Sequence, residues 1–197
     1  MDDSFETLIS GYLDNEVGIS SDFINEALAT NLQNNLLTIH GKGLFHSAGT
    51  GNDSVISQDK KTRSDEIYWL DKKHEDKYEN EFFSQMDDFV KYLNHSCYTG
   101  ITDYEFHYSM YERGSFYKKH LDQFKSNSSR QFSMISYLNK DWKEEDGGQL
   151  LIHPEKGDQT INPTQGKTVF FKSSELEHEV LVSNKQRMSI TGWLKRE

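Results

Sequence analysis

The spacing of apolar residues changes its period near residue 103, and this change limits the possible folds more than any other feature of the chain. Before it, apolar residues recur at helical spacing over 4–37 and 78–95. Ser20 and Ser21 are candidate N-caps for a helix within the first of these segments. After it, polar and apolar residues alternate, which is typical of strands with one buried face.

The second half of the chain is therefore predicted to consist of short strands. They are expected from 103 onward and then over 131–138, 149–153, 167–172, 178–183 and 187–194. Many short strands that follow helices indicate a sandwich or a barrel. We expect an α+β fold, with a double-stranded β-helix (jelly-roll) core and the N-terminal helices packed on one sheet.

The whole chain, 1–197, is expected to form one domain, because a chain of this length can bury a stable core without disulfide bonds or a structural metal. Residues 1–100 would form its helical N-terminal part, and 101–197 its jelly-roll core. Within the first part, 47–66 is rich in Ser, Gly, Asn, Asp and Lys and is predicted to be a long mobile loop. Long loops often cover binding sites, so we expect this one to close over a bound polypeptide.

Composition argues against several classes of protein. The lone Cys97 leaves no partner for an internal disulfide and fits a reducing compartment. The acidic start, Met1-Asp2-Asp3, does not resemble a secretory signal, and no apolar run is long enough to span a membrane. The net charge of −10 argues against a nucleic-acid partner. We expect a cytoplasmic protein that binds neither nucleic acid nor membrane.

The last predicted strand has one polar and one apolar face. Its apolar face, with Met188, Ile190 and Leu194, needs a partner that the N-terminal helices can supply. The opposite face would then point into the barrel; it carries Arg187, Ser189, Thr191 and Trp193. A buried arginine must be paired with an anion. That anion is either an acidic side chain or the carboxylate of a ligand.

A metal site is suggested by His120-Leu121-Asp122, which places two ligand side chains two residues apart on one side of a strand. His178, on a later strand, would complete a set of two histidines and one carboxylate, the ligand set of non-haem iron(II) oxygenases. The segment His74-Glu75-Asp76 has the same His-x-Asp spacing. It lies in a run of charges without strand alternation, so we interpret it as a solvated surface segment.

Further motifs, in their order along 61–197, resemble the prolyl hydroxylases that depend on iron(II) and 2-oxoglutarate. The chain is most similar to the hypoxia-inducible-factor type and its small bacterial relatives. The motifs are Arg63-Ser64-Asp65 with Trp69, Met86-Asp87-Asp88, Tyr137 to Trp142, Gly147 to Leu150, His153-Pro154-Glu155, Ile161-Asn162-Pro163, Val169-Phe170-Phe171, His178-Glu179-Val180 and Arg187 to Trp193.

This resemblance implies a single oxygenase domain with iron(II) bound by His120, Asp122 and His178. It implies 2-oxoglutarate and O2 as co-substrates, while ascorbate is left open as an additional cofactor. Arg187 would bind the distal carboxylate of 2-oxoglutarate, assisted by the Tyr137 hydroxyl. No separate catalytic acid or base is expected beside the metal centre.

Three more positions carry roles in the resemblance. Tyr111 would hydrogen-bond 2-oxoglutarate nearer its metal end, although it precedes His120 by one residue fewer than in the animal enzymes. Thr191 would line the same pocket. Arg130 matches a position that contacts the target peptide.

The activity implied is hydroxylation of a prolyl residue at C4 in a protein, with release of succinate and carbon dioxide. A free amino acid or another small molecule is the alternative substrate. A catalytically silent jelly-roll module that senses metal or co-substrate is the alternative outside the enzymes, and turnover of 2-oxoglutarate would separate the two.

Overall fold

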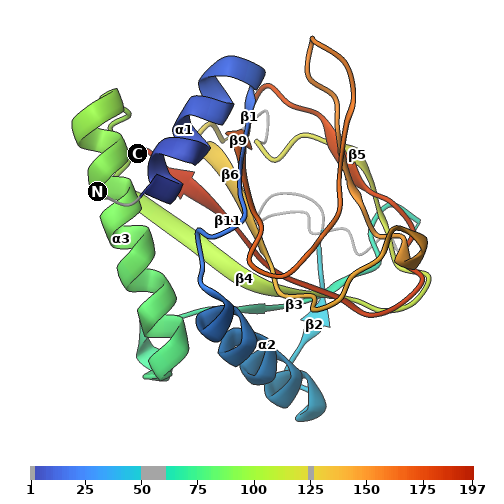
Figure 1. The fold of residues 1–197 in the computed structure, drawn as a ribbon. Helices are drawn as coiled ribbons and strands as arrows, with labels where there is room; N and C mark the ends of the chain where they lie inside the picture. The colour runs from blue at the N-terminus through green and yellow to red at the C-terminus, as the bar shows by residue number, and fades with distance from the viewer. Residues whose placement is uncertain (1–2, 50–60, 124–126) are drawn as a thin grey trace.

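The computed structural model describes residues 3–49, 61–123 and 127–197, which form two antiparallel sheets and three α-helices (Figure 1). The larger sheet has seven strands in the order β1-β9-β6-β11-β4-β3-β2. The smaller sheet has four, in the order β5-β10-β7-β8. The strands are β1 (Val17–Ser20), β2 (His46–Ser47), β3 (Glu66–Trp69), β4 (Asp103–Tyr111), β5 (Tyr117–His120), β6 (Arg130–Tyr137), β7 (Leu150–Ile152), β8 (Gln159–Ile161), β9 (Thr168–Lys172), β10 (His178–Val180) and β11 (Arg187–Lys195).

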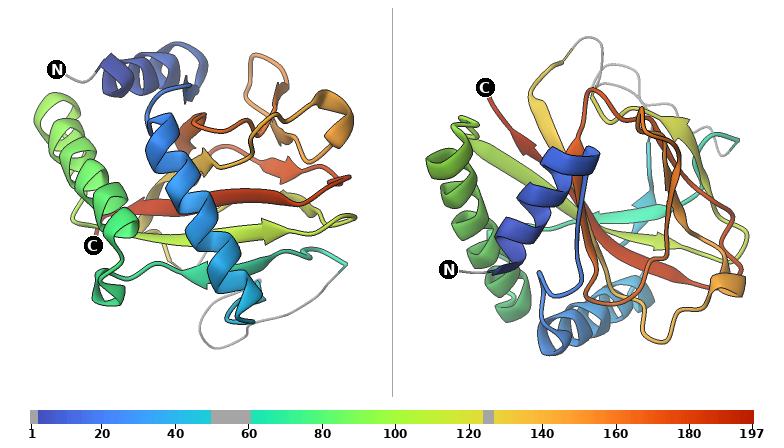
Figure 2. Two further views of the ribbon diagram at one scale, coloured as in Figure 1. Left: turned by 60° about the horizontal axis from the view of Figure 1, so that its bottom comes forward. Right: turned by 45° about the horizontal axis from the view of Figure 1, so that its top comes forward.

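The helices are α1 (Asp3–Asn15), α2 (Glu26–Gly41) and α3 (Lys77–Cys97). All three cover the face of the larger sheet that points away from the smaller one (Figure 2). The apolar stripe of α3, including Phe82, Phe89 and Leu93, belongs to the same buried cluster as Ile190 and Leu194 of β11. The prediction that N-terminal helices bury the apolar face of the last strand is thus confirmed.

The segment predicted as helical over 4–37 is interrupted by a strand. Helix α1 ends before Glu16, whose φ of 64° turns the chain, and β1 then pairs with β9. A Cβ at Gly18 would lie only 2.0 Å from the Leu8 carbonyl oxygen, so this close approach of β1 to α1 requires glycine. The predicted caps are also wrong, because the N-cap of α2 is Asn25, which accepts a hydrogen bond from the Leu28 amide.

The strand predictions hold best where strands are long. The segments over 131–138 and 187–194 correspond closely to β6 and β11, whereas the strand predicted over 178–183 ends at Val180. The two-residue β2 and the short β3 and β8 were not predicted. Strands this short carry too few residues to show an alternating pattern.

Between the two sheets lies a second apolar core. Its members come from both sheets and include Ile135 and Val169 of the larger sheet and Leu150 and Val180 of the smaller one. This core fills the space beside the polar inward face of β11. The inward side chains of Arg187, Thr191 and Trp193 line a narrow pocket that opens between the sheets.

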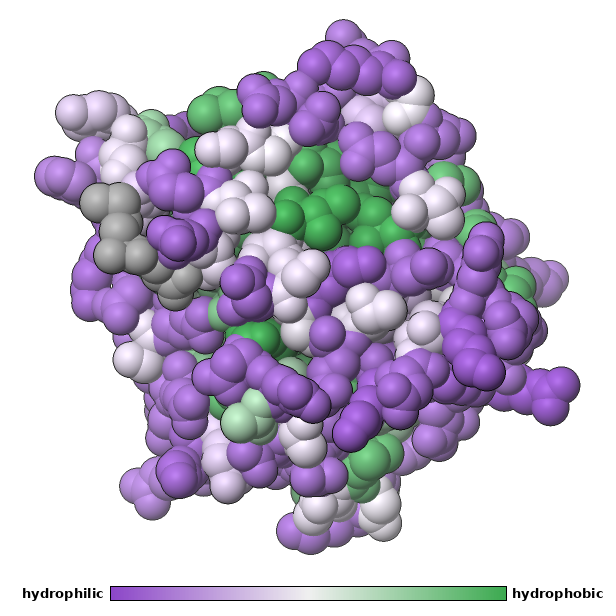
Figure 3. Space-filling view, in the orientation of Figure 1, coloured by the Kyte–Doolittle hydropathy of each residue, from purple (hydrophilic) through white to green (hydrophobic). Residues whose placement is uncertain are grey.

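Residues 50–60, the centre of the predicted loop 47–66, lie outside the described residues. On either side the chain is held by strand pairing, with Ser47 opposite Glu66 and the Ala48 amide bonded to the Asp65 carbonyl. None of the helices in the described ranges is long and apolar enough to cross a membrane. The face seen in Figure 1 is largely hydrophilic, with hydrophobic side chains gathered above its centre (Figure 3).

Candidate active site

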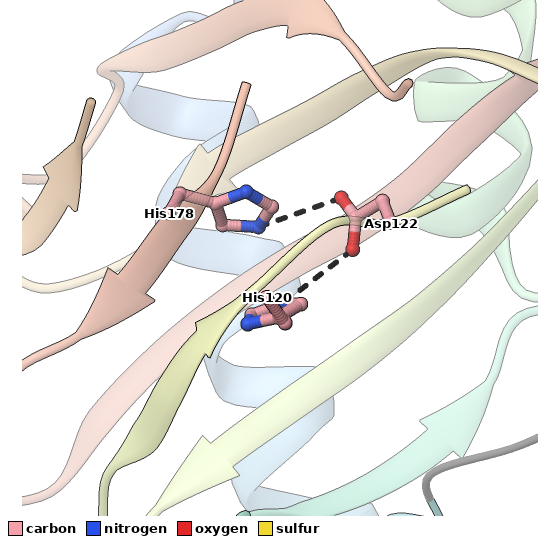
Figure 4. Close-up of side chains that lie close together, drawn as sticks. All are labelled: His120, Asp122 and His178. Atoms are coloured by element: carbon pink, nitrogen blue, oxygen red, sulfur yellow. Dashed lines mark ion pairs between the residues drawn. The ribbon is translucent and has the colours of Figure 1, made fainter. Parts of the chain in front are cut away.

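Three side chains predicted as metal ligands converge between the sheets (Figure 4). His120 ends β5, Asp122 follows it by two residues, and His178 begins β10, directly opposite His120 in the strand register. The Nε2 atom of His120 lies 3.5 Å from Oδ1 of Asp122, and that of His178 lies 3.5 Å from Oδ2. In the described part of the chain, this is the one group of three or more His, Cys, Asp or Glu residues whose ligand atoms lie this close together.

Backbone carbonyls determine which nitrogen of each imidazole can bind a metal. Nδ1 of His120 lies 2.7 Å from the Lys118 carbonyl, and Nδ1 of His178 lies 3.1 Å from the Leu176 carbonyl. A carbonyl can only accept, so Nδ1 carries the proton and Nε2 carries the lone pair. Two lone pairs and a carboxylate therefore face one another, an arrangement that a divalent cation stabilises.

The carboxylate of Asp122 is buried and is held in place by a second layer of hydroxyl groups. Ser133 on β6 donates to Oδ2 at 2.6 Å, and Ser173 lies 2.9 Å from the Ser133 hydroxyl. Burial alone would raise the pKa of Asp122, but the two histidines and Ser133 outweigh it and lower that pKa. Burial also lowers the pKa of His178 to about 4, so its ring is neutral and able to coordinate at neutral pH.

The hydrogen bond from Ser133 leads to a specific prediction. Ser133→Ala should weaken metal binding about 10- to 100-fold, because partners that orient a ligating carboxylate typically contribute that much. The affinity is measured by calorimetric titration with Mn(II). Ser136→Ala is the matched control, since Ser136 lies on the same strand, is equally buried and bonds Thr168 instead. Equal effects of the two substitutions would contradict a role for Ser133 at the metal.

Arg187 begins β11 opposite Tyr111 and is 1% exposed. Its Nε donates to the Gly148 carbonyl at 2.8 Å, and its guanidinium carbon lies 4.8 Å from the ring centre of Tyr111 and 5.1 Å from that of Tyr137. Within the described residues, neither its Nη2 nor the Tyr137 hydroxyl forms a hydrogen bond. Two buried donors without a protein acceptor fit a ligand carboxylate, since unpaired buried donors are costly.

Gly148 makes room for this arginine. It has a φ of 62°, and a Cβ at this position would lie 3.0 Å from Cδ of Arg187 and 2.9 Å from Oγ of Ser183. A side chain here would both strain the backbone and displace the arginine. The glycine in the turn before β7 is therefore part of what supports Arg187 at this end of the pocket.

The structure also places the remaining predicted residues. Thr191 lines the pocket, with its hydroxyl 3.3 Å from that of Ser189. Arg130, predicted to contact a target, forms an ion pair with Glu105 at 2.8 Å and lies over the ring of Trp193 at 3.4 Å. Arg130 is thus not in the pocket lining itself, but it packs on a residue that is.

Several pocket residues were not identified as site residues from sequence, among them Tyr117, Arg63 and His107. Tyr117 stacks on the ring of His120, with centroids 3.5 Å apart. The guanidinium carbon of Arg63 lies over the Tyr117 ring, 4.5 Å from its centroid. Arg63 is itself fixed by two hydrogen bonds to the buried Asp65. His107 gave no functional signal by itself, although the alternation of β4 places it on the same inward face as Tyr111.

The second His-x-Asp motif is not a metal site, but it is more than a solvated surface segment. His74 lies 3.1 Å from the carboxylate of Glu79, a residue that is 1% exposed. Asp76 is the N-cap of α3 and accepts hydrogen bonds from the amides of Tyr78 and Glu79. The segment is exposed to solvent, as interpreted from the sequence, and two of its polar residues also stabilise the start of a helix.

Comparison with known proteins shows which family this site resembles. Residues 106–195 match the model of the 2OG-Fe(II) oxygenase superfamily. The matched segment contains every residue of the candidate metal and anion sites described above. The match confirms the expected cofactors, iron(II) and 2-oxoglutarate.

Within this class, the chain is similar to prolyl hydroxylases, as its motifs predicted. A prolyl-4-hydroxylase from Pseudomonas putida superimposes with a TM-score of 0.88 at 28% identity, covering 98% of this chain and 99% of that one. A prolyl hydroxylase from Trichoplax adhaerens, solved with a peptide fragment of the hypoxia inducible factor oxygen degradation domain, has the same fold, with a TM-score of 0.86, 22% identity and coverage of 97% and 88%.

The human protein Egl nine homolog 1 is 26% identical over 195 residues. The alignment covers 89% of this chain but 42% of the human protein, so the chain spans less than half the length of that relative.

Proposed function

We propose that the protein hydroxylates a prolyl residue at C4 in a protein or peptide, using iron(II), 2-oxoglutarate and O2 and releasing succinate and carbon dioxide. The observation that carries this proposal is a single pocket with two kinds of binding group. One wall brings together two imidazole Nε2 atoms and a carboxylate, and the facing sheet presents the buried guanidinium of Arg187. Similarity to prolyl hydroxylases supports the choice of substrate.

In this proposal His120, Asp122 and His178 hold the iron, which supplies the activation of O2 together with 2-oxoglutarate. Arg187 and Tyr137 bind the distal carboxylate through their unpaired donors. Burial raises the pKa of the Tyr137 hydroxyl to about 12, so it remains a donor at neutral pH.

Tyr111 and Thr191 complete the co-substrate pocket. Tyr111 donates to 2-oxoglutarate beside Arg187, and burial keeps its hydroxyl protonated by raising its pKa. Thr191 lines the middle of the pocket. The apolar lining residues Ile135, Leu150 and Val180 would limit the access of water to the reacting centre.

The target is proposed to lie over Trp193, with Arg130 beside it. Arg130 is held between Glu105 and the indole, so it is positioned to act on a polypeptide that covers Trp193 rather than on the co-substrate. We further propose that residues 1–197 form one oxygenase domain of the double-stranded β-helix type. Its place of action is the cytoplasm, supported by the single, exposed cysteine.

The test is a search for the product. Protein, iron(II) and 2-oxoglutarate are incubated with a host lysate and a proline-peptide library under oxygen-18 gas, and peptides are sequenced by mass spectrometry. The proposal expects one heavy oxygen on a proline of a peptide, together with formation of succinate. Hydroxylated free proline without any modified peptide would favour the small-molecule enzyme. Absence of succinate under all conditions would favour the silent sensor module.

A further inference from the structure

His107 lies on the inward face of β4, in a part of the pocket that none of the roles above uses. It is 1% exposed and lines the pocket. In the strand register it lies opposite Thr191 of β11 on one side and Trp69 of β3 on the other. Its ring packs edge-on against Trp69, with centroids 5.1 Å apart, and lies 5.6 Å from the ring of Trp193.

The hydrogen bonds of His107 assign its tautomer. Nδ1 lies 3.1 Å from the Tyr108 carbonyl, which can only accept, so Nδ1 carries the proton. The Ser109 hydroxyl, also 3.1 Å from Nδ1, can accept from the same N–H group. Nε2 on the opposite edge of the ring then has a lone pair, and no described residue hydrogen-bonds it. Burial and the nearby Arg63 lower the pKa of His107 to about 4, so the ring stays neutral.

The position of His107 along β4 places it at the end of the pocket away from Arg187, opposite Thr191. Tyr111, next to Arg187, marks the anion-binding end of the strand. His107 is four residues away, which corresponds to about 13 Å in an extended strand. A five-carbon diacid bound at Arg187 is shorter than this distance, so it extends toward the level of Thr191 and leaves the Nε2 edge of His107 to another group. Trp69, which flanks His107, is 40% exposed and lies at the outer edge of the site, so the group that reaches His107 enters from outside.

We propose that His107 is a substrate-positioning residue whose Nε2 accepts a hydrogen bond from the backbone N–H of the residue that follows the target proline. This inference rests on the proposed prolyl hydroxylation. Proline itself has no amide hydrogen within a chain, so the next residue supplies the donor. Free proline has a carboxylate at that place, and its negative charge would face the lone pair of Nε2. His107 thus selects a proline within a peptide over the free amino acid.

Two substitutions of His107 distinguish the role of Nε2 from that of Nδ1. In His107→Gln the side-chain oxygen can occupy the place of Nε2, whereas His107→Asn can keep the bond to the Tyr108 carbonyl but does not reach as far. We expect Asn to raise the KM for the best peptide from the library about tenfold, the effect of leaving one buried donor unpaired. His107→Gln should keep the KM for this peptide near that of the wild-type protein. The KM for 2-oxoglutarate and the melting temperature should stay near those of His95→Asn, an exposed control on α3.

A peptide in which an ester oxygen replaces that one N–H gives the decisive comparison. The wild-type protein should bind the ester about tenfold more weakly than the amide, and His107→Asn should bind both equally. An equal preference for the amide in both proteins would overturn the inference while leaving peptide hydroxylation intact. Nitrogen-15 NMR of labelled histidine provides a test without turnover, because a protonated Nε2 on His107 would also overturn it. Failure of the proposed function would instead appear as no hydroxylated peptide.

Discussion

Replacing His120, Asp122 or His178 with alanine is expected to weaken Mn(II) binding at least about 100-fold and to remove turnover of 2-oxoglutarate. Each change deletes one of three protein ligands, and residues that merely orient such ligands already contribute about 10- to 100-fold. Mn(II) is a redox-stable probe for calorimetry. Metal should raise the melting temperature of the wild-type protein but not of the variants, since only a ligand that binds the folded state stabilises it.

The control for this series has to be a histidine without a structural partner. His74 is unsuitable because it pairs with buried Glu79, and Asp76 is unsuitable because it caps α3. His95→Ala is suitable, since His95 is exposed on α3. If His95→Ala weakened Mn(II) binding as much as the triad substitutions do, the metal assignment would be wrong.

The second large effect is expected at Arg187. Arg187→Ala should raise the Kd for 2-oxoglutarate at least about 30-fold, because truncating one partner of a buried, charged hydrogen bond costs about 2 kcal/mol or more. Arg187→Lys should lose less, since it keeps the charge but cannot form two parallel hydrogen bonds. Both Kd values are measured by calorimetry on the Mn(II)-loaded protein.

Mn(II) affinity and melting temperature distinguish this loss from general damage. Arg187→Lys should leave Mn(II) binding unchanged, because the arginine does not contact the triad. Tyr137→Phe should weaken 2-oxoglutarate binding in the same direction but less, as it removes one neutral donor. Unchanged 2-oxoglutarate affinity in both Arg187 variants would show that the guanidinium serves the fold alone.

The parts of the fold that could be predicted are those in which one local pattern extends over many residues. Strand β11 has nine residues, and polar and apolar side chains alternate from Arg187 to Thr191, so both of its faces follow from the sequence. Strand β1 has four, and it lies between two segments of helical spacing that conceal it. Its pairing with β9 depends on residues about 150 positions away, as its register with Phe171 shows, and no local pattern contains that information.

The site also contains residues that a local pattern predicts and residues that only the fold brings together. The triad and Arg187 could be predicted because metal and carboxylate chemistry restrict the residue types at fixed positions. Arg130 illustrates the limit, since its partners Glu105 and Trp193 come from two other strands. His107 and Tyr117 are ordinary residues in a strand pattern, and their place in the pocket follows only from how the two sheets face each other.

The central claim is that one pocket binds the metal and 2-oxoglutarate together, and the dependence of one on the other tests it most directly. Calorimetry should show tight binding of 2-oxoglutarate to the Mn(II)-loaded protein and much weaker binding to the metal-free protein. In Asp122→Ala, added Mn(II) should bring no gain. Equal 2-oxoglutarate affinity with and without Mn(II) in the wild-type protein would contradict the claim.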